Sequence, residues 1–340
     1  MSLTKALPIR SIKHTGNTIK TRFLILSDTH ACDVAAPKQY ADVALHCGDL
    51  TQRSKMSEFR KSLALLKSIN SPLKLVIPGN HDFTLDETLF RGGEFKTRRL
   101  LSTKEREMEY GRTGDAIALM EEASEAGIFY LKEGTHQFKL SNGASLKLFA
   151  SPYIPSLLEW GFRYEPSKGH KYEIKEGTDL VMTHCPPKGI LDANYQGDEV
   201  GCPHLFEAVA RIRPRLHCFG HSHEGWGAKL VTWRGDAASE RHSRMADVDE
   251  YHSVLVQHLD GLRRSSEDDE RIIEEKADKV RAAYNERCYR TSHCSGDNHP
   301  IILGRKTLFI NAAMKGSKEA EYPMHLPWLV DAELLMANAD

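Results

Sequence analysis

The chain has 340 residues, of which 27% are charged and 40% are hydrophobic, and its formal net charge is −1. This length allows one large domain or two smaller ones, and a charge near zero argues against a general nucleic-acid binder. No stretch is long and apolar enough to span a bilayer, and the first twenty residues lack the apolar run of a signal peptide. The seven cysteines are scattered and odd in number, which suits a reducing compartment. We therefore expect a cytoplasmic protein without a membrane partner, and the sequence leaves its oligomeric state open.

Apolar runs of strand length recur along the chain and alternate with helical patterns. The predicted strands are 22–27, 43–46, 73–77, 145–150, 179–183, 216–219, 228–233 and 307–311. Apolar residues at helical spacing predict helices over 54–69 and 116–126. The alternation predicts an α/β fold.

The stretch from Arg234 to Pro300 breaks this pattern because it is charged and rich in histidine. One helix is predicted within it, starting at a Ser265-Ser266 cap. The strands on either side, 228–233 and 307–311, are expected to form one hairpin. We therefore expect a single domain over residues 1–340, with 234–300 as an insertion that can be flexible.

Short polar motifs follow five of the predicted strands. They are Asp28-Thr29-His30, Gly48-Asp49, Gly79-Asn80-His81-Asp82, Thr183-His184 and Gly220-His221-Ser222-His223. Residues i and i+2 of an extended strand tip point the same way, so Asp28 and His30 are expected to reach one metal. Ligands bind at the carboxyl ends of strands in open α/β sheets, so the five motifs are predicted to converge.

The side chains in these motifs point to a site for two metals. Imidazole, carboxylate and amide ligands without thiolate favour a divalent ion such as Mn, Fe or Zn. The candidate ligands are Asp28, His30, Asp49, Asn80, His184, His221 and His223. They are too many for one zinc ion but suit two metals roughly 3.5–4 Å apart that share a carboxylate, for which Asp49 is the candidate.

In this order, DTH, GD, GNHD, TH and GHSH resemble the calcineurin-like metallophosphoesterase superfamily. Within it, ADVALHCGD, THCPP and RIRPRLHCFGHSHEGWG look like the metallophosphoesterase-domain-containing (MPPED) branch, described as class III cyclic-nucleotide phosphodiesterases. The resemblance covers roughly 21–230 and resumes at 307–313. It implies a four-layer αββα sandwich.

The resemblance also implies a role for each motif residue. The first metal would be held by Asp28, His30, Asp49 and His223. The second would be held by Asp49, Asn80, His184 and His221, while His81 would face the leaving group.

The expected reaction is hydrolysis at phosphorus by a hydroxide that bridges the two metals. His81 is expected to protonate the departing alkoxide, and Asp82 is a weaker candidate for orienting it. Two divalent metals, two aspartates and a hydroxide sum to about +1, which mildly favours small phosphodiesters, cyclic nucleotides included.

Two rival functions stay open. One is a phosphomonoesterase or phosphoprotein phosphatase that uses the same core with a different rim. The other is a nucleotide-binding or scaffold protein with little turnover.

For the remaining histidine, aromatic and basic residues, a structural role is weighed against a functional one. His46 and His217 lie inside apolar strands and are expected to be hydrogen-bonded core histidines. The aromatic stretch Ser151 to Tyr164 either walls the substrate cleft or covers a sheet edge. A basic run at 96–99 is expected to be a solvated helix face.

Overall fold

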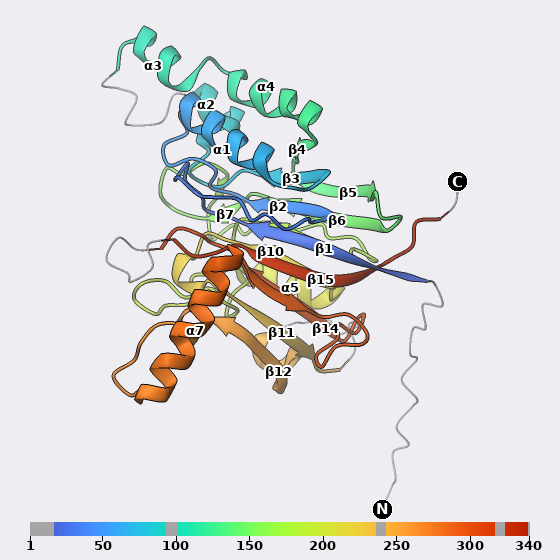
Figure 1. The fold of residues 1–340 in the computed structure, drawn as a ribbon. Coiled ribbons are helices and arrows are strands. Elements are labelled where there is room, and N and C mark those ends of the chain that lie inside the picture. The colour runs from blue at the N-terminus through green and yellow to red at the C-terminus, as the bar shows by residue number, and fades with distance from the viewer. Residues whose placement is uncertain (1–16, 93–100, 236–242, 317–323, 339–340) are drawn as a thin grey trace, which may run out of the picture.

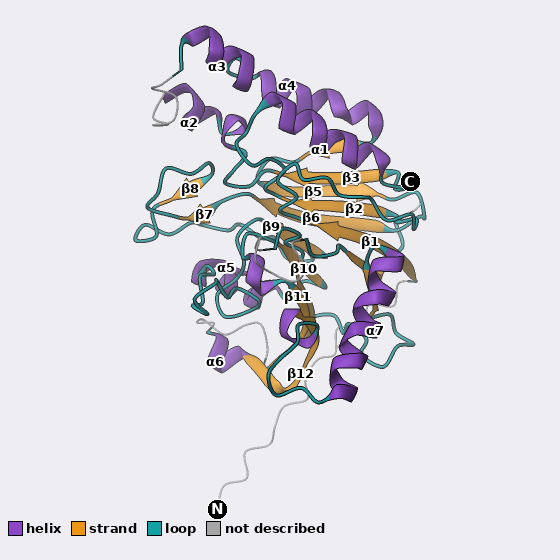
Figure 2. Ribbon diagram, turned by 60° about the vertical axis from the view of Figure 1, so that its left-hand side comes forward, coloured by secondary structure: helices purple, strands orange, loops and turns teal. Residues whose placement is uncertain are grey.

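The computed structural model describes residues 17–92, 101–235, 243–316 and 324–338, and the basic run at 96–99 lies outside them. Two sheets pack face to face, and helices cover the outer face of each (Figures 1 and 2). The expected αββα sandwich is therefore confirmed. Among the described residues, no helix is long and apolar enough to cross a membrane.

The first sheet has six strands in the order β13-β15-β1-β2-β3-β4. Their bounds are β1 Thr18–Leu26, β2 Val43–Cys47, β3 Leu73–Ile77, β4 Ile128–Tyr130, β13 Tyr289–Ser292 and β15 Trp328–Leu335. Strands β1 to β4 run parallel, so the motifs that follow β1, β2 and β3 leave the sheet at the same edge.

The second sheet has seven strands in the order β12-β11-β14-β10-β9-β6-β5. Their bounds are β5 Gly134–Lys139, β6 Ser145–Ser151, β9 Leu180–Thr183, β10 Leu216–Phe219, β11 Gly227–Trp233, β12 Val248–His258 and β14 Lys306–Asn311. Parallel pairing of β6, β9, β10 and β14 brings the ends of β9 and β10 to one edge. Two short strands, β7 Ile154–Pro155 and β8 Arg163–Tyr164, form a separate pair.

The helices lie outside the two sheets. Their bounds are α1 Met56–Ser68, α2 Glu87–Gly92, α3 Thr103–Tyr110, α4 Asp115–Glu122, α5 Pro203–Ile212, α6 Arg244–Asp247 and α7 Glu270–Glu286. In Figure 1, α1 and α4 lie above the six-stranded sheet.

Three buried clusters fill the three spaces between the four layers. The middle cluster joins the facing sheets, with Leu45 of β2 and Met182 of β9 among its members. A second joins the other face of the six-stranded sheet to α1 through Phe59, and a third joins the seven-stranded sheet to α5 through Phe206. Each such large apolar side chain contributes roughly 1.5–3 kcal/mol by leaving water, so the layers hold the strand ends rigidly.

The predicted strands match the observed ones closely, and β3 and β10 match at both ends. The expected hairpin between β11 and β14 is confirmed as an antiparallel pair. The predicted N-cap of α7 at Ser265-Ser266 is wrong. The N-cap is Asp269, whose side chain accepts the hydrogen bond from the Ile272 N–H.

The described part of the stretch 234–300 pairs with both sheets. In its described part, β12 extends the seven-stranded sheet and β13 extends the six-stranded sheet. Val280 of α7 enters the cluster between the sheets, and Tyr289 packs edge-on against Trp226 with ring centroids 4.9 Å apart. We therefore expect the fold to depend on this stretch.

Candidate metal centre

The five motifs converge where the two sheets meet at their carboxyl-end edge. Hydrogen bonds cross between the loops and hold them together: the Asp28 N–H donates to the Gly48 carbonyl at 2.9 Å, and the His81 N–H donates to Asp49 Oδ1 at 2.8 Å. The His221 N–H donates to the Asp28 carboxylate at 3.0 Å, which links the two sheets. The convergence predicted from strand ends is therefore observed.

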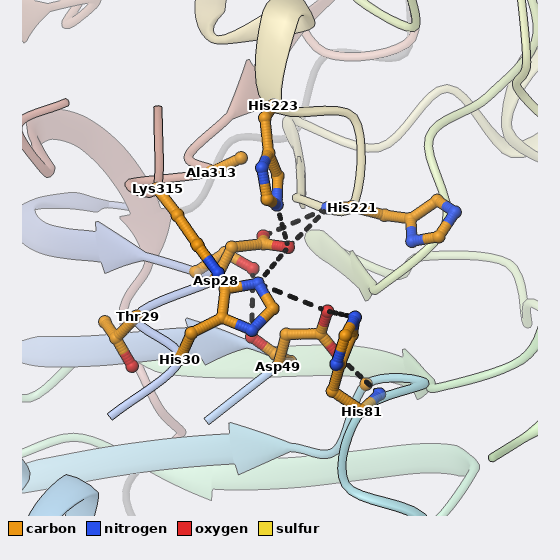
Figure 3. A network of polar contacts seen from close by, with 12 residues as sticks. Asp28, Thr29, His30, Asp49, His81, His221, His223, Ala313 and Lys315 are labelled. Carbon is orange, nitrogen blue, oxygen red and sulfur yellow. Dashed lines mark hydrogen bonds and ion pairs between the residues drawn. The ribbon is translucent and has the colours of Figure 1, made fainter. Parts of the chain in front are cut away.

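A first group of ligand atoms comes from Asp28, His30 and His223, all within 4.8 Å of one another. His223 Nε2 lies 3.4 Å from Asp28 Oδ1, and His30 Nε2 lies 4.0 Å from the same oxygen (Figure 3). These contacts bring together three of the four side chains expected at the first metal.

Asp49 connects this group to a second one formed by Asp28, Asp49 and His184. One Asp49 oxygen lies 3.4 Å from His184 Nε2, and the other lies 3.6 Å from His30 Nε2. Asn80 Oδ1 lies 3.0 Å from His184 Nε2. Asp49 is thus placed with one oxygen toward each group, as a shared carboxylate must be.

His221 sits beside the second group. Its ring centroid is 5.0 Å from that of His184, and Figure 3 shows its ring turned away from His30 and His223. Its backbone N–H holds Asp28, while its ring belongs to the His184 side of the centre.

Three imidazoles are oriented in the same way, by a backbone carbonyl at Nδ1. The carbonyl partners are Thr51 for His30 at 3.1 Å, Cys47 for His184 at 2.9 Å and Gln52 for His81 at 2.8 Å. An Nδ1–H that donates to a carbonyl leaves the Nε2 lone pair available for a metal, which is how metal-ligating histidines are held.

The donor set fits a metal, and His30 gives the clearest sign. Its Nε2 is buried and has no hydrogen-bond partner among the described residues, although two carboxylates lie within 4.0 Å. An unpartnered buried polar atom is costly, and a cation between His30 and the carboxylates would satisfy it.

The backbone at this edge is left-handed, and this corrects one sequence argument. Asp28, His30, Asp49 and His221 have φ of 53°, 46°, 54° and 66°. Asp28 and His30 therefore do not converge as i and i+2 of an extended tip. They converge because the chain turns, at a cost of about 1–3 kcal/mol for each strained residue that the packed sheets sustain.

Two glycines allow the loops to come this close. A Cβ on Gly220 would lie 2.0 Å from Asp28 Oδ2, and one on Gly79 would lie 2.2 Å from Asp49 Oδ1. The glycines of the GHSH and GNHD motifs are thus required by close approach to the carboxylates.

The carboxylates create a strong demand for positive charge. Burial opposes ionisation of Asp28 and Asp49, but neighbouring histidines, His184 among them, outweigh it and lower the pKa of both carboxyl groups. Burial would lower the pKa of His184 as well, yet Asp49 outweighs this and raises it to about 9. A divalent cation is the natural replacement for that proton.

The sequence profile of the calcineurin-like phosphoesterase family matches residues 21–225, which contain all the motif residues. The chain belongs to this family.

Several curated relatives match the same part of the chain. Metallophosphoesterase domain-containing protein 1 of Homo sapiens is 32% identical over 212 residues, which cover 61% of this chain and 62% of that protein. A UPF0046 protein of Caenorhabditis elegans is 27% identical over 213 residues, covering 61% and 52%. A probable rhamnogalacturonate lyase C of Emericella nidulans is 32% identical over 222 residues, covering 65% and 18%. The chain thus spans less than two thirds of each relative.

His81 lies at the rim of the candidate metal centre. Its Nε2 is 4.0 Å from Asp49 Oδ2, its side chain is 21% exposed, and it forms a third ligand group with His30 and Asp49. Its position suits contact with a substrate, and it is also close enough to be a ligand.

Asp82 has a different role from the expected one. Its carboxylate is fully buried and accepts hydrogen bonds from the backbone N–H groups of Leu50, Thr51 and Gly79, and from the Thr51 hydroxyl. The contact at His81 Nδ1 comes from Gln52 instead. Asp82 therefore fixes the GD loop against the GNHD loop, because its carboxylate accepts hydrogen bonds from backbone groups of both. Burial, with the Asp49 charge, raises the pKa of Asp82 to about 6.

His46 and His217 are core histidines, as predicted. Each is buried, and each Nε2 lies 2.9 Å from the hydroxyl of a motif threonine, Thr29 for His46 and Thr183 for His217. They fix the loops without touching the ligand groups.

The aromatic stretch contacts the metal centre at one residue and the core at another. The Trp160 ring lies against His81, with centroids 4.8 Å apart and planes at 41°, and the Gly161 N–H donates to the Asn80 carbonyl at 3.1 Å. Phe162, two residues on, is buried in the cluster under α1. Trp160 therefore walls the metal centre while Phe162 anchors the loop.

Three further residues hold or line this centre and carried no role in the sequence motifs. Asn311, at the end of β14, donates to the carbonyls of Leu191 and Ser222 and so holds the GHSH loop. Gln52 contacts His81, and Lys315 contacts Gln52. Asn311 lies within the resemblance at 307–313, which assigned it no role, whereas Gln52 and Lys315 belong to no motif.

Proposed function

We propose that the protein is a metal-dependent phosphoesterase that hydrolyses small phosphodiesters, cyclic nucleotides included. The observation that carries this proposal is the sharing of Asp49 between two ligand groups, next to a buried His30 Nε2 that lacks a hydrogen-bond partner among the described residues. Family membership supports phosphoester hydrolysis in general, and the preference for nucleotide diesters rests on Trp160 beside His81.

The residues that would hold two divalent ions fall into two sets. The first is Asp28, His30, Asp49 and His223, and the second is Asp49, Asn80, His184 and His221. Nitrogen and oxygen donors without thiolate fit Mn, Fe or Zn. When bound, such ions make water acidic and neutralise charge that develops on a phosphoryl group.

His81 would supply the proton for the leaving group. The Gln52 carbonyl fixes Nδ1 and leaves Nε2 on the side of the centre that faces Trp160 and solvent. An imidazolium there delivers a proton from Nε2 to the departing alkoxide.

Trp160 supports substrates with a planar group. Its half-buried ring beside His81 provides a face on which a base can stack while the phosphate lies over the ligand groups. A base stacked on this ring contributes more binding energy than a small aryl group does. The ring therefore favours nucleotide diesters over simple aryl esters.

The test is turnover by metal-depleted protein reconstituted with Mn, Fe, Zn or Mg, on a panel of diesters and matching monoesters. We expect higher kcat/KM on diesters, with cyclic nucleotides among the substrates. Better cleavage of monoesters throughout would replace this proposal with a phosphomonoesterase, and no turnover with any metal would favour a binding or scaffold role.

The cytoplasm remains our proposal for the compartment. All seven cysteines are free thiols, as expected for a protein that stays in a reducing environment.

A further inference from the structure

Lys315 reaches the metal centre on a segment that crosses from one sheet to the other. After β14 the chain continues past the sheet edge, and the Ala312 N–H donates to the Phe219 carbonyl at 2.8 Å. Two residues later the Met314 N–H donates to the Ser27 carbonyl at 2.9 Å, directly before the DTH motif. The next residue, Lys315, is therefore delivered to the first ligand group.

The segment is also held from its other side. His325 donates from its backbone N–H to the Met314 carbonyl and contacts the Ala313 carbonyl through Nδ1 at 3.0 Å. The His325 ring packs against Trp226. Lys315 is thus fixed at its backbone, and its side chain extends from a rigid base.

The Lys315 side chain is half-buried and points toward Asp28 and His30 (Figure 3). Its ammonium donates a hydrogen bond to Gln52 Oε1. The same Gln52 meets His81 Nδ1 through its carbonyl at 2.8 Å and through Nε2 at 3.4 Å. Lys315 and His81 therefore flank one glutamine at the rim.

Lys315 adds a positive charge to a centre that two divalent ions already make positive when bound. The added charge suits a phosphate group with two negative charges, which is the charge state of a monoester and of the product of diester cleavage. From this arrangement we infer that Lys315 is an anion-binding residue that contacts the oxygens of a dianionic phosphate monoester. The inference rests on the proposed phosphoesterase function.

The experiment uses the Mn-loaded full chain and compares wild type with Lys315→Met and Lys315→Arg. Binding of orthophosphate is measured by titration calorimetry, and metal content is measured separately. We expect Lys315→Met to keep its metals and bind orthophosphate about tenfold more weakly, while Lys315→Arg stays within about threefold of wild type. Lys229→Met is the matched control, because it removes a half-buried lysine of β11 that pairs with Glu250 of β12, away from the centre.

Kinetics on 4-nitrophenyl phosphate and bis(4-nitrophenyl) phosphate separate the two sources of the dianion. If the monoester is a substrate, Lys315→Met lowers its kcat/KM about tenfold and that of the diester much less. If the monoester is only a product, the variant weakens its inhibition of diester cleavage and leaves diester kcat/KM nearly unchanged.

Unchanged orthophosphate affinity in Lys315→Met would overturn the inference. Loss of bound metal together with loss of orthophosphate binding would also overturn it, because Lys315 would then have only a structural role. Lys315→Gln, which keeps a polar chain without the charge, replaces the methionine variant if that variant does not fold. The diester preference is judged separately, from the kcat/KM ratio of the wild type.

Discussion

The floor of the metal centre and its rim are built on different principles. The floor consists of Asp28, His30, Asp49 and His184, which are all buried and held by backbone groups from neighbouring loops. The rim consists of His81, Trp160 and Lys315, which are partly exposed and meet one another through rings or through Gln52. A rigid floor can keep one chemistry while the rim sets the substrate. Substitutions in the floor should therefore reduce metal binding and all activity, whereas substitutions in the rim should change rate or substrate preference with the metals retained.

The largest effect is expected from Asp49→Ala, which removes the shared carboxylate of the floor. Activity should fall by about a thousandfold or more, together with loss of bound metal, because no neighbouring side chain can serve both groups. Metal content and kcat/KM measured on the same sample check this. Asp33→Ala, at an exposed aspartate that pairs with Lys61, should behave as wild type. Turnover near that of wild type in Asp49→Ala would remove the basis for the whole centre.

His81→Ala tests where the floor ends and the rim begins. The variant should keep both metals and lose several hundredfold in kcat, most severely for esters with poor leaving groups, because it lacks the proton donor. His252→Ala, at an exposed histidine, is the control. His81 also lies within ligand distance of Asp49 and His30, so loss of one metal in His81→Ala would move it from the rim to the floor.

Gly220→Ala probes how tightly the floor is packed. A methyl group there would collide with Asp28 Oδ2 and with Ser27 Oγ, at 2.0 and 2.1 Å, and must displace the carboxylate. We expect about a hundredfold lower kcat/KM, since displacements of about 1 Å in a catalytic site have effects of this size. Gly296→Ala is the control, because an added Cβ there meets no atom within 4 Å, and its kcat/KM should equal that of wild type. Equal activity of the two variants would mean that the floor can relax.

The same division explains what the sequence could predict. The floor follows from local signals, because each ligand comes directly after a buried apolar strand, and parallel strands bring their ends to one edge. The rim depends on contacts that no local pattern encodes. Lys315 reaches the centre only because the chain passes from the end of β14 to the end of β1. Asp82 became a candidate for orienting the leaving group only because it follows His81 in the sequence, whereas its contacts are structural.

The strands of the stretch 234–300 were missed for a related reason. Strand β12 lies at a sheet edge and has mostly half-exposed or exposed side chains, so its apolar run is only three residues long, from Val254 to Val256. Strand β13 has only four residues and none is fully buried. Edge strands with this composition resemble loops in sequence and are recognised only from their pairing partners.

The smallest expected effect concerns the rim alone. Trp160→Ala removes the ring that lies 4.8 Å from His81, while leaving every floor contact in place. Stacking of a base on an aromatic ring contributes about 1–3 kcal/mol, so kcat/KM for nucleotide diesters should fall about tenfold, and that for a small aryl diester much less. Leu158→Ala, at an exposed residue of the same loop, controls for general loosening of the loop. The ratio of the two kcat/KM values is the decisive quantity. A disturbed floor lowers kcat/KM for both substrates by the same factor and leaves their ratio unchanged. An unchanged ratio would therefore show that Trp160 does not bind the base, and selectivity would have to come from elsewhere on the rim.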